Sequence, residues 1–500
     1  MTKIYDLLVI GGGINGTAIA RDAAGRGLSV LLCEKDDLAS HTSSASTKLI
    51  HGGLRYLEQY EFRLVRESLK EREVLLKAAP HIIWPLRFVL PHDKGLRPAW
   101  LLRLGLLIYD YIGGRKILPP TRTVSLLKGD RADLLQPRLK KGFEYSDCWV
   151  KDSRLVALNA VDAKSKGADI LTRTEVKNIA EDNGKYSAKI DVNGTAQTIY
   201  AKGIVNAAGP WVSRVLKKID TRHDGKDVRL IKGSHIVTCK LFDGPQAYIF
   251  QNADNRIIFA IPYEQDYTLI GTTDVPVTES AEKAEISEEE IAYLCAAINE
   301  YFTRSISKDD VVWSYSGIRP LFDDQSENAS TVTRDYVLKL HDAAGEAPFL
   351  SVYGGKITTS RKLAEHALEK LRPFYSGMSD SWTRTAIFPG GGIPNMDFDS
   401  FLYALQKKHP DIDHKVLRHL ARSYGTSSEH ILNRNEGMGQ MFGQNLSEAE
   451  VAYLVSNEFV TQADDILWRR TKLGLCMTKT EIQNFKKWFD KNYTKDHDKS

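Results

Sequence analysis

Three glycines near the N-terminus, Gly11, Gly13 and Gly16, have the spacing of a turn that binds a dinucleotide. In such a turn the first glycine permits a tight bend, the second lets the backbone approach a pyrophosphate, and the third lets a helix pack closely on a strand. An acid, Glu34, follows where a ribose would need an acceptor for its two hydroxyls. Because an acid disfavours a 2′-phosphate, the pattern predicts NAD or FAD, and therefore redox chemistry.

The segments around these residues supply the elements that must position them. Residues 4–10 have the pattern of a buried strand, residues 14–26 that of a helix, and residues 28–33 that of a second strand. The helix N-terminus would offer free N–H groups and a positive dipole end to the pyrophosphate. A glycine triplet alone could be a turn without function, but both strands, the helix and the acid together favour a nucleotide site.

Bulk composition excludes several other classes of protein. The chain has 500 residues, more than one ordinary core, so two or three domains are expected. Its five cysteines are far apart and form no CxxC pair, which argues against a zinc site and a disulfide framework, and we expect no metal. The net charge of +4 is too small to indicate nucleic acid, and no run of about 18 apolar residues could span a bilayer.

Charge is unevenly distributed along the chain. Residues 94–141 hold eleven basic and three acidic residues around the apolar, aromatic-edged segment 98–111. A basic and apolar helix of this kind suits the surface of an anionic bilayer. The same pattern also fits a buried core helix with basic neighbours, and the sequence slightly favours this second interpretation.

The order of the predicted elements gives the fold class. Residues 229–275 alternate like antiparallel strands, residues 395–500 have the pattern of helices, and the glycine turn at 354–355 indicates a late return to the first domain. A flavin enzyme needs that return, whereas a simple NAD dehydrogenase rarely does. We predict an α/β + α protein with a discontinuous Rossmann-type FAD-binding domain (1–80, 145–228 and 330–390), an antiparallel-sheet substrate and membrane-facing domain (81–144 and 229–329) and a C-terminal helical domain (391–500).

Several motifs together resemble one family; they are Ser43–Glu58, Asn206–Trp211, Ser316–Leu321, Gly354–Thr359 and Ala463–Lys472. With the glycine fingerprint they closely resemble FAD-dependent glycerol-3-phosphate dehydrogenase, the membrane-associated, quinone-linked enzyme of respiration. The resemblance implies that glycerol 3-phosphate loses a hydride from C2 to flavin N5, giving dihydroxyacetone phosphate, and that two electrons pass to a membrane quinone. No EF-hand loop is present, which departs from the animal mitochondrial relatives and argues against calcium control.

The resemblance also implies a cofactor site and a location. The expected protein is a homodimer with noncovalent FAD, peripheral on an anionic membrane surface at the cytoplasmic face of the inner (plasma) membrane and partly in the cytoplasm. His51 could link the flavin covalently, but a structural role near the flavin is favoured. The implied cofactor residues are Gly11, Gly13, Ile14, Asn15, Gly16, Glu34, Lys35, Ser44, Ser46, Lys48, Leu49, His51, Gly52, Ala208, Gly209, Trp211, Gly355, Lys356 and Thr358.

A substrate phosphate requires fixed cations. The cations inside the family-like motifs are Arg55, Arg319 and Lys356, and we carry the substrate site over onto them with Tyr56, His235 and Thr272 as polar partners. Hydride loss from C2 also requires a base for the hydroxyl proton. By residue type His235 is the candidate, although a single strand histidine is more often structural, so the predicted catalytic group is His235, Arg319, Lys356 and Arg55.

Three alternative functions stay open at this point. An oxidase of the same substrate would use O2 and produce H2O2. An oxidase of a small amino acid or amine with the same fold would need one arginine for a carboxylate rather than several cations for a phosphate. A flavin-binding scaffold without activity would have no reason to retain the three cations and the histidine.

Overall fold

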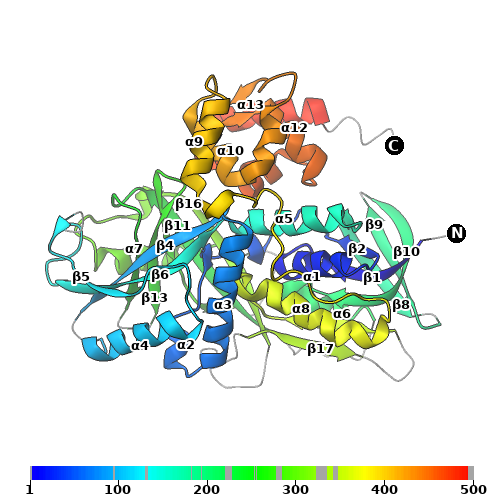
Figure 1. Cartoon of the computed structure of the whole chain (residues 1–500), viewed down its shortest axis with the longest axis horizontal. Helices are drawn as coiled ribbons and strands as arrows, with labels where there is room; N and C mark the ends of the chain where they lie inside the picture. The colour runs from blue at the N-terminus through cyan, green and yellow to red at the C-terminus, as the bar shows by residue number, and fades with distance from the viewer. Residues whose placement is uncertain are drawn as a thin grey trace.

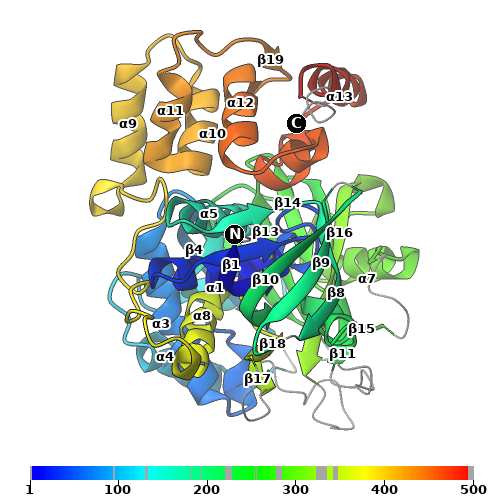
Figure 2. The same cartoon turned by 90° about the vertical axis from the view of Figure 1, so that its right-hand side faces the viewer.

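The computed structural model describes residues 3–93, 96–129, 133–181, 183–192, 194–219, 228–252, 254, 256–277, 284–322, 335–341 and 347–493. Two β-sheets lie side by side, and the C-terminal helices lie above both of them (Figure 1). Figure 2 shows the same two layers from the side, with the first sheet toward the viewer. The predicted fold class, a Rossmann-type part, a second sheet and a helical C-terminal part, is confirmed.

The first sheet forms the Rossmann-type core. Its strands follow the order β17 (Val337–His341), β18 (Phe349–Tyr353), β10 (Thr195–Asn206), β1 (Ile4–Ile10), β2 (Val30–Cys33) and β7 (Asp169–Leu171), with β8 (Thr174–Glu181) and β9 (Tyr186–Val192) joined beside β10. The strands from β18 to β7 are parallel. Parallel strands are buried on both faces, which explains why β2 is an unbroken apolar run.

Helices cover this sheet and bring the late chain back to it. Helix α1 (Ile14–Gly25) packs against α5 (Asp152–Ser165) and α8 (Ser360–Leu371), and all three contribute to one core. Strand β18 and helix α8 therefore return to the first domain, as the glycine turn at 354–355 predicted.

Among the described residues, the second sheet has ten strands and is almost wholly antiparallel. Its strands are β3 (Leu49–Ile50), β4 (Ile83–His92), β5 (Arg122–Ser125), β6 (Lys141–Val150), β11 (Val228–Cys239), β12 (Ala247–Gln251), β13 (Ile257–Tyr263), β14 (Tyr267–Gly271), β15 (Val275–Pro276) and β16 (Val311–Phe322). Helix α7 (Glu288–Asn299) packs on it. Two segments that the prediction assigned to the first domain lie in this second sheet: β3, which pairs with β6, and residues 145–150 of β6, which pair with β4.

The C-terminal part is helical and has its own apolar core. It contains α9 (Phe398–Lys408), α10 (His414–Tyr424), α11 (Glu429–Leu432), α12 (Glu448–Asn457), a π-helical turn (Asp465–Arg470) and α13 (Lys479–Tyr493). These helices lie above the first sheet and above α5 in both views (Figure 2).

The basic segment after β4 forms an exposed helix. Helix α3 (Phe62–Ala78) and the short α2 (Arg55–Glu58) precede it, and α4 (Ala99–Ile112) lies at the end of the molecule opposite the C-terminal helices (Figure 1). Only three residues of α4 are buried, Leu106, Tyr109 and Asp110, so the interpretation as a buried core helix is wrong. Lys94, Asp130 and Arg131 of the basic stretch lie outside the described residues. Within the described ranges, no helix is both long and apolar enough to cross a membrane.

Candidate active site

A cavity opens where the first sheet meets the second. Its wall is built by the β1–α1 turn, the loop that follows β2, the segment between β10 and α6 (Val212–Leu216), and the glycine turn before α8. Ten of the predicted cofactor residues line it: Gly11, Gly13, Ile14, Asn15, Glu34, Lys35, Ala208, Gly209, Trp211 and Gly355.

The surroundings of the three fingerprint glycines show what a side chain would meet at each position. Gly11 has φ +113°, and a Cβ there would lie 2.6 Å from the carbonyl oxygen of Ala207. A Cβ on Gly16 would overlap the carbonyl oxygen of Gly11, so this glycine lets α1 approach β1. At Gly13 a Cβ would meet only the Ser43 hydroxyl, at 3.1 Å, and this backbone therefore faces the cavity.

Glu34 is fixed at the cavity wall. Its two carboxylate oxygens accept hydrogen bonds from the backbone N–H of Gly12, at 2.6 Å, and of Asp36, at 2.8 Å. Burial raises the pKa of this carboxyl. Each oxygen keeps a further lone pair, so Glu34 can still accept hydrogen bonds from a ribose.

Two buried polar atoms fit the expectation that a polar ligand fills this cavity. The Asn15 Oδ1 and Trp211 Nε1 atoms have no hydrogen-bond partner within the described part of the chain, and both residues line the cavity. Buried polar atoms are nearly always satisfied, so an acceptor and a donor remain here for a ligand such as FAD. The Asn15 side-chain amide also donates to the carbonyl of Gly354, at 3.0 Å, and so ties the start of α1 to the late glycine turn.

The remaining predicted cofactor residues lie off the cavity wall; they are Gly16, Ser44, Ser46, Lys48, Leu49, His51, Gly52, Lys356 and Thr358. Lys48 is buried and donates to Asp152 at 2.8 Å. The backbone N–H of His51 donates to the hydroxyl of Thr358 at 3.2 Å, which joins two of the family-like motifs. Burial, with Lys356 and Arg72, lowers the pKa of His51 to about 3.

Sequence reasoning missed several lining residues: Ile10, Cys33, Ala39, Ser40, His41, Thr42, Ser43, Thr174, Glu175, Val176, Ala207, Pro210, Arg214, Val215, Lys218, Pro320 and Gly354. Seven of them, Ile10, Cys33, Ser43, Ala207, Pro210, Pro320 and Gly354, are direct chain neighbours of predicted residues, and for these seven that adjacency was the available signal. Residues 174–176 had no such signal; they reach the cavity because the backbone N–H of Thr174 donates to the carbonyl of Glu34, at 2.7 Å.

The predicted substrate residues form two groups. In the first, the Arg319 guanidinium donates to the Thr272 hydroxyl at 3.1 Å and pairs with Asp274, an acid that was not predicted. In the second, the Lys356 ammonium lies 3.8 Å from the centre of the Tyr56 ring. Arg55 begins α2 next to Tyr56, is half-buried, and forms no ion pair within the described ranges.

His235 is buried beside the first group. Its Nε2 lies 3.0 Å from the Thr47 hydroxyl, while its Nδ1 has no partner among the described residues. Burial, with the charges of Arg319 and Lys48, holds the pKa of His235 well below its usual range. The imidazole is therefore neutral at physiological pH, the state that a general base requires.

Comparison with known proteins identifies the relatives of this arrangement. Residues 6–361 match the model of the family described as FAD dependent oxidoreductase. The chain belongs to this family. Residues 381–488 of this FAD-dependent oxidoreductase match the C-terminal domain of alpha-glycerophosphate oxidase.

The relatives place this oxidoreductase beside dehydrogenases of phosphorylated polyols. It is 52% identical to D-erythritol 1-phosphate dehydrogenase from Brucella abortus and 50% identical to aerobic glycerol-3-phosphate dehydrogenase from Escherichia coli, each over 97% of both chains. A structure of glycerol-3-phosphate dehydrogenase from Bacillus halodurans complexed with FAD superimposes with a TM-score of 0.74 at 28% identity, covering 98% of this chain and 95% of that one. The predicted family and the FAD cofactor are confirmed.

Proposed function

We propose that the protein oxidises sn-glycerol 3-phosphate to dihydroxyacetone phosphate. The observation that carries this proposal is the 50% identity, over nearly the whole length, to an aerobic glycerol-3-phosphate dehydrogenase. A neutral buried histidine close to Arg319, in a chain whose glycine fingerprint and Glu34 line a cavity, supports the same chemistry.

In the proposed reaction, one residue removes a proton and the others bind the substrate phosphate. When bound, FAD supplies the acceptor for the C2 hydride and the route of the electron pair to a membrane quinone. His235 removes the C2 hydroxyl proton, and its neutral state leaves it free to do so. Arg319 and Lys356, with Arg55, hold the phosphate, and Asp274 keeps Arg319 in place until the phosphate replaces it as a partner.

A second candidate substrate is D-erythritol 1-phosphate. The 52% identity to the Brucella abortus enzyme favours it, and both substrates present a phosphate ester to the same cations. The test is anaerobic bleaching of the flavin spectrum by each ester at equal concentration, followed by the ratio of kcat/KM. We expect kcat/KM for glycerol 3-phosphate to exceed that for D-erythritol 1-phosphate by more than tenfold. A reversed ratio would support the erythritol ester, and bleaching by neither would end both proposals.

The electron acceptor is a separate proposal. We infer a membrane quinone, so that turnover with a quinone analogue should form little peroxide. One H2O2 formed per substrate oxidised would instead favour the O2-dependent oxidase. Bleaching by glycine or proline, without bleaching by either phosphate ester, would favour the amino-acid oxidase.

Membrane contact is proposed for the exposed face of α4. Trp100 is 69% exposed, and Leu104, Leu107, Ile108 and Tyr111 are exposed with it. The basic residues Arg97 and Lys116 flank this face and are exposed too. An apolar stripe with basic flanks binds an anionic bilayer by lying in its interface. We place it at the cytoplasmic face of the inner membrane, and we keep the homodimer as a prediction.

A further inference from the structure

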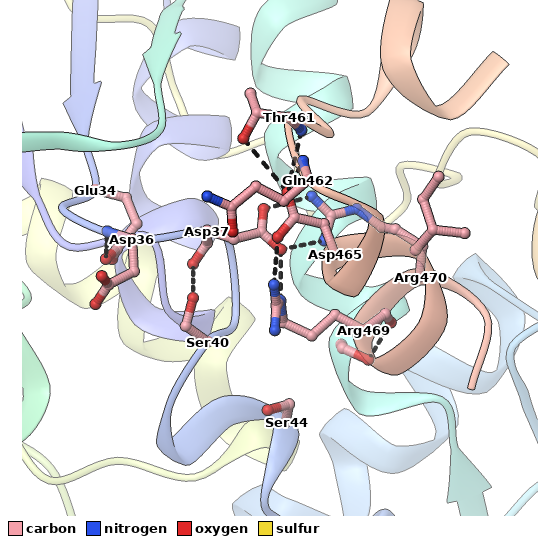
Figure 3. Close-up of polar contacts among 12 residues, drawn as sticks. Glu34, Asp36, Asp37, Ser40, Ser44, Thr461, Gln462, Asp465, Arg469 and Arg470 are labelled. Atoms are coloured by element: carbon pink, nitrogen blue, oxygen red, sulfur yellow. Dashed lines mark hydrogen bonds and ion pairs between the residues drawn. The ribbon is translucent and has the colours of Figure 1, made fainter. Parts of the chain in front are cut away.

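A buried carboxylate joins the cofactor loop to the C-terminal part of the chain. Asp37 is fully buried three residues after Glu34. The Arg470 guanidinium donates to both of its oxygens, at 2.9 and 2.8 Å, and Arg469 Nε donates to one of them at 2.6 Å. Figure 3 shows these side chains reaching from the C-terminal segment to the loop that carries Glu34, Asp36, Asp37 and Ser40.

The two arginines are themselves held in place. Arg469 also pairs with Asp465, and Asp465 accepts from Arg173 at 2.7 Å. The backbone N–H of Arg173 donates to the carbonyl of Asp36, at 2.9 Å. Asp465 is therefore connected to the cofactor loop through Arg173 as well. On the other side, Arg470 donates to the carbonyl of Glu458 at 2.8 Å. Each arginine therefore has a further partner besides Asp37, Asp465 for Arg469 and Glu458 for Arg470.

The segment that Asp37 anchors is part of the cofactor site. Residues 39–43 line the cavity directly after it, and Ser40 donates from its hydroxyl to the carbonyl of Asp37. Ala39 has φ +60°, a backbone conformation that costs free energy for a residue with a Cβ and persists only when its surroundings impose it. None of the described residues from 381 to 488 lines the cavity itself, and the C-terminal domain contacts the cavity loop at Asp37 directly and at Asp36 through Arg173.

We propose that Arg469 and Arg470 are positioning residues for FAD: through Asp37 they hold the loop 36–44 in the conformation that binds the cofactor. A loop that is already ordered in the apoprotein loses little conformational entropy when the ligand binds, so the ligand binds more tightly. The C-terminal domain would then serve the flavin site from a distance, without touching the cofactor.

The test measures FAD affinity rather than turnover alone. Arg470→Lys keeps the charge but loses the two-pronged contact with Asp37. The FAD-free protein is titrated with FAD by flavin fluorescence, and we expect Kd to rise about tenfold. At saturating FAD, kcat should recover, because the arginine does not take part in the chemistry.

The matched control is Arg422→Lys. Arg422 belongs to the same C-terminal domain and packs over Trp84 and Phe398, away from the loop. Its replacement should leave the Kd for FAD unchanged. A rise in Kd as large as that of Arg470→Lys would overturn the proposal, since loosening the domain anywhere would then be enough.

A milder variant covers the case in which Arg470→Lys fails to fold. Arg469→Gln removes the charge of a side chain that is 17% exposed, and with it the Arg469–Asp37 ion pair. The Arg470–Asp37 pair stays intact. We expect a smaller but measurable rise in the Kd for FAD and faster flavin release. An unchanged Kd, with only a lower melting temperature of the apoprotein, would make this network purely structural and refute the proposal.

Discussion

The imidazole of His235 stacks on the ring of Tyr315, with the ring centroids 4.9 Å apart and the planes 18° from parallel. The Tyr315 hydroxyl donates to the carbonyl of Ser46 at 2.8 Å, which fixes the tyrosine. Stacking on one face and the Thr47 contact at Nε2 therefore hold the histidine in a single orientation. A general base needs that fixed orientation as much as it needs a suitable pKa.

Replacing this histidine should separate catalysis from binding. We expect His235→Gln to lower kcat by at least about 100-fold, because general base catalysis contributes on that scale. Binding of dihydroxyacetone phosphate, measured by its perturbation of the flavin spectrum, should weaken far less. His430→Gln, at an exposed position, is the control and should change neither. Equal losses of rate and binding would assign His235 a structural role.

Buried histidines should make the protein sensitive to mild acid. Burial, with Arg154, Arg422 and Lys151, lowers the pKa of His81 to about 3. Between pH 3 and about 6.5 the unfolded chain therefore binds a proton that the folded chain does not, and stability falls as the pH falls.

Urea unfolding at pH 7.5 and pH 5.5 measures this dependence. We expect His81→Leu to remove about 1.4 kcal/mol from the difference in unfolding free energy between these two pH values, because only the part of the interval below pH 6.5 contributes. The exposed His430→Leu should leave the slope as it is in the parent. A parental slope in the His81 variant would mean that folding leaves the pKa of this histidine unchanged.

Replacing Gly16 by alanine should affect mainly stability, whereas replacing Gly13 by alanine should affect mainly FAD affinity. Gly16→Ala places a Cβ into the carbonyl of Gly11, so we expect a loss of several kcal/mol of stability by thermal unfolding. Gly13→Ala meets only the Ser43 hydroxyl and should cost about 1 kcal/mol as a poorer N-cap. Its added methyl faces the cavity, and FAD titration should therefore show a large loss of affinity. The reverse pattern would place the pyrophosphate elsewhere.

The α4 face can be tested on vesicles. Leu107→Glu with Ile108→Glu puts two carboxylates on the exposed apolar stripe and should release the protein from anionic phospholipid vesicles in a flotation assay. Substrate-driven flavin bleaching should remain at the parental level. Tyr403→Glu, at an exposed position on α9 at the other end of the molecule, is the control and should stay bound. Retention of the double variant would move membrane contact to another face.

Residues predicted from local spacing come together on one cavity wall. Gly11, Gly13 and Glu34 lie within one strand–helix–strand unit, so their spacing alone brings them to one wall. Asp274 was not predicted because its contact with Arg319 depends on segments that are distant in the sequence. It meets Arg319 because β11 lies between β16 and the β14–β15 segment, and strand pairing of this kind has no mark in the local sequence.

Helix α4 shows a second limit. Periodicity tells that a helix has an apolar face, but not whether protein, lipid or water lies against it. Only the position of α4 on the outside of α3 decides that Leu107 and Ile108 face outward. The roles assigned to Arg55, Arg319, Lys356 and His235 remain predictions.

Asp37 and Arg470 meet across 433 positions of sequence. A ribosome must therefore have made nearly the entire polypeptide before the loop beside Glu34 can be locked. If the proposed role of Arg470 holds, newly synthesised protein would bind flavin tightly only after residue 470 has emerged. Chains that terminate early, before residue 469, would hold flavin weakly even though every residue that lines the cavity had already been translated.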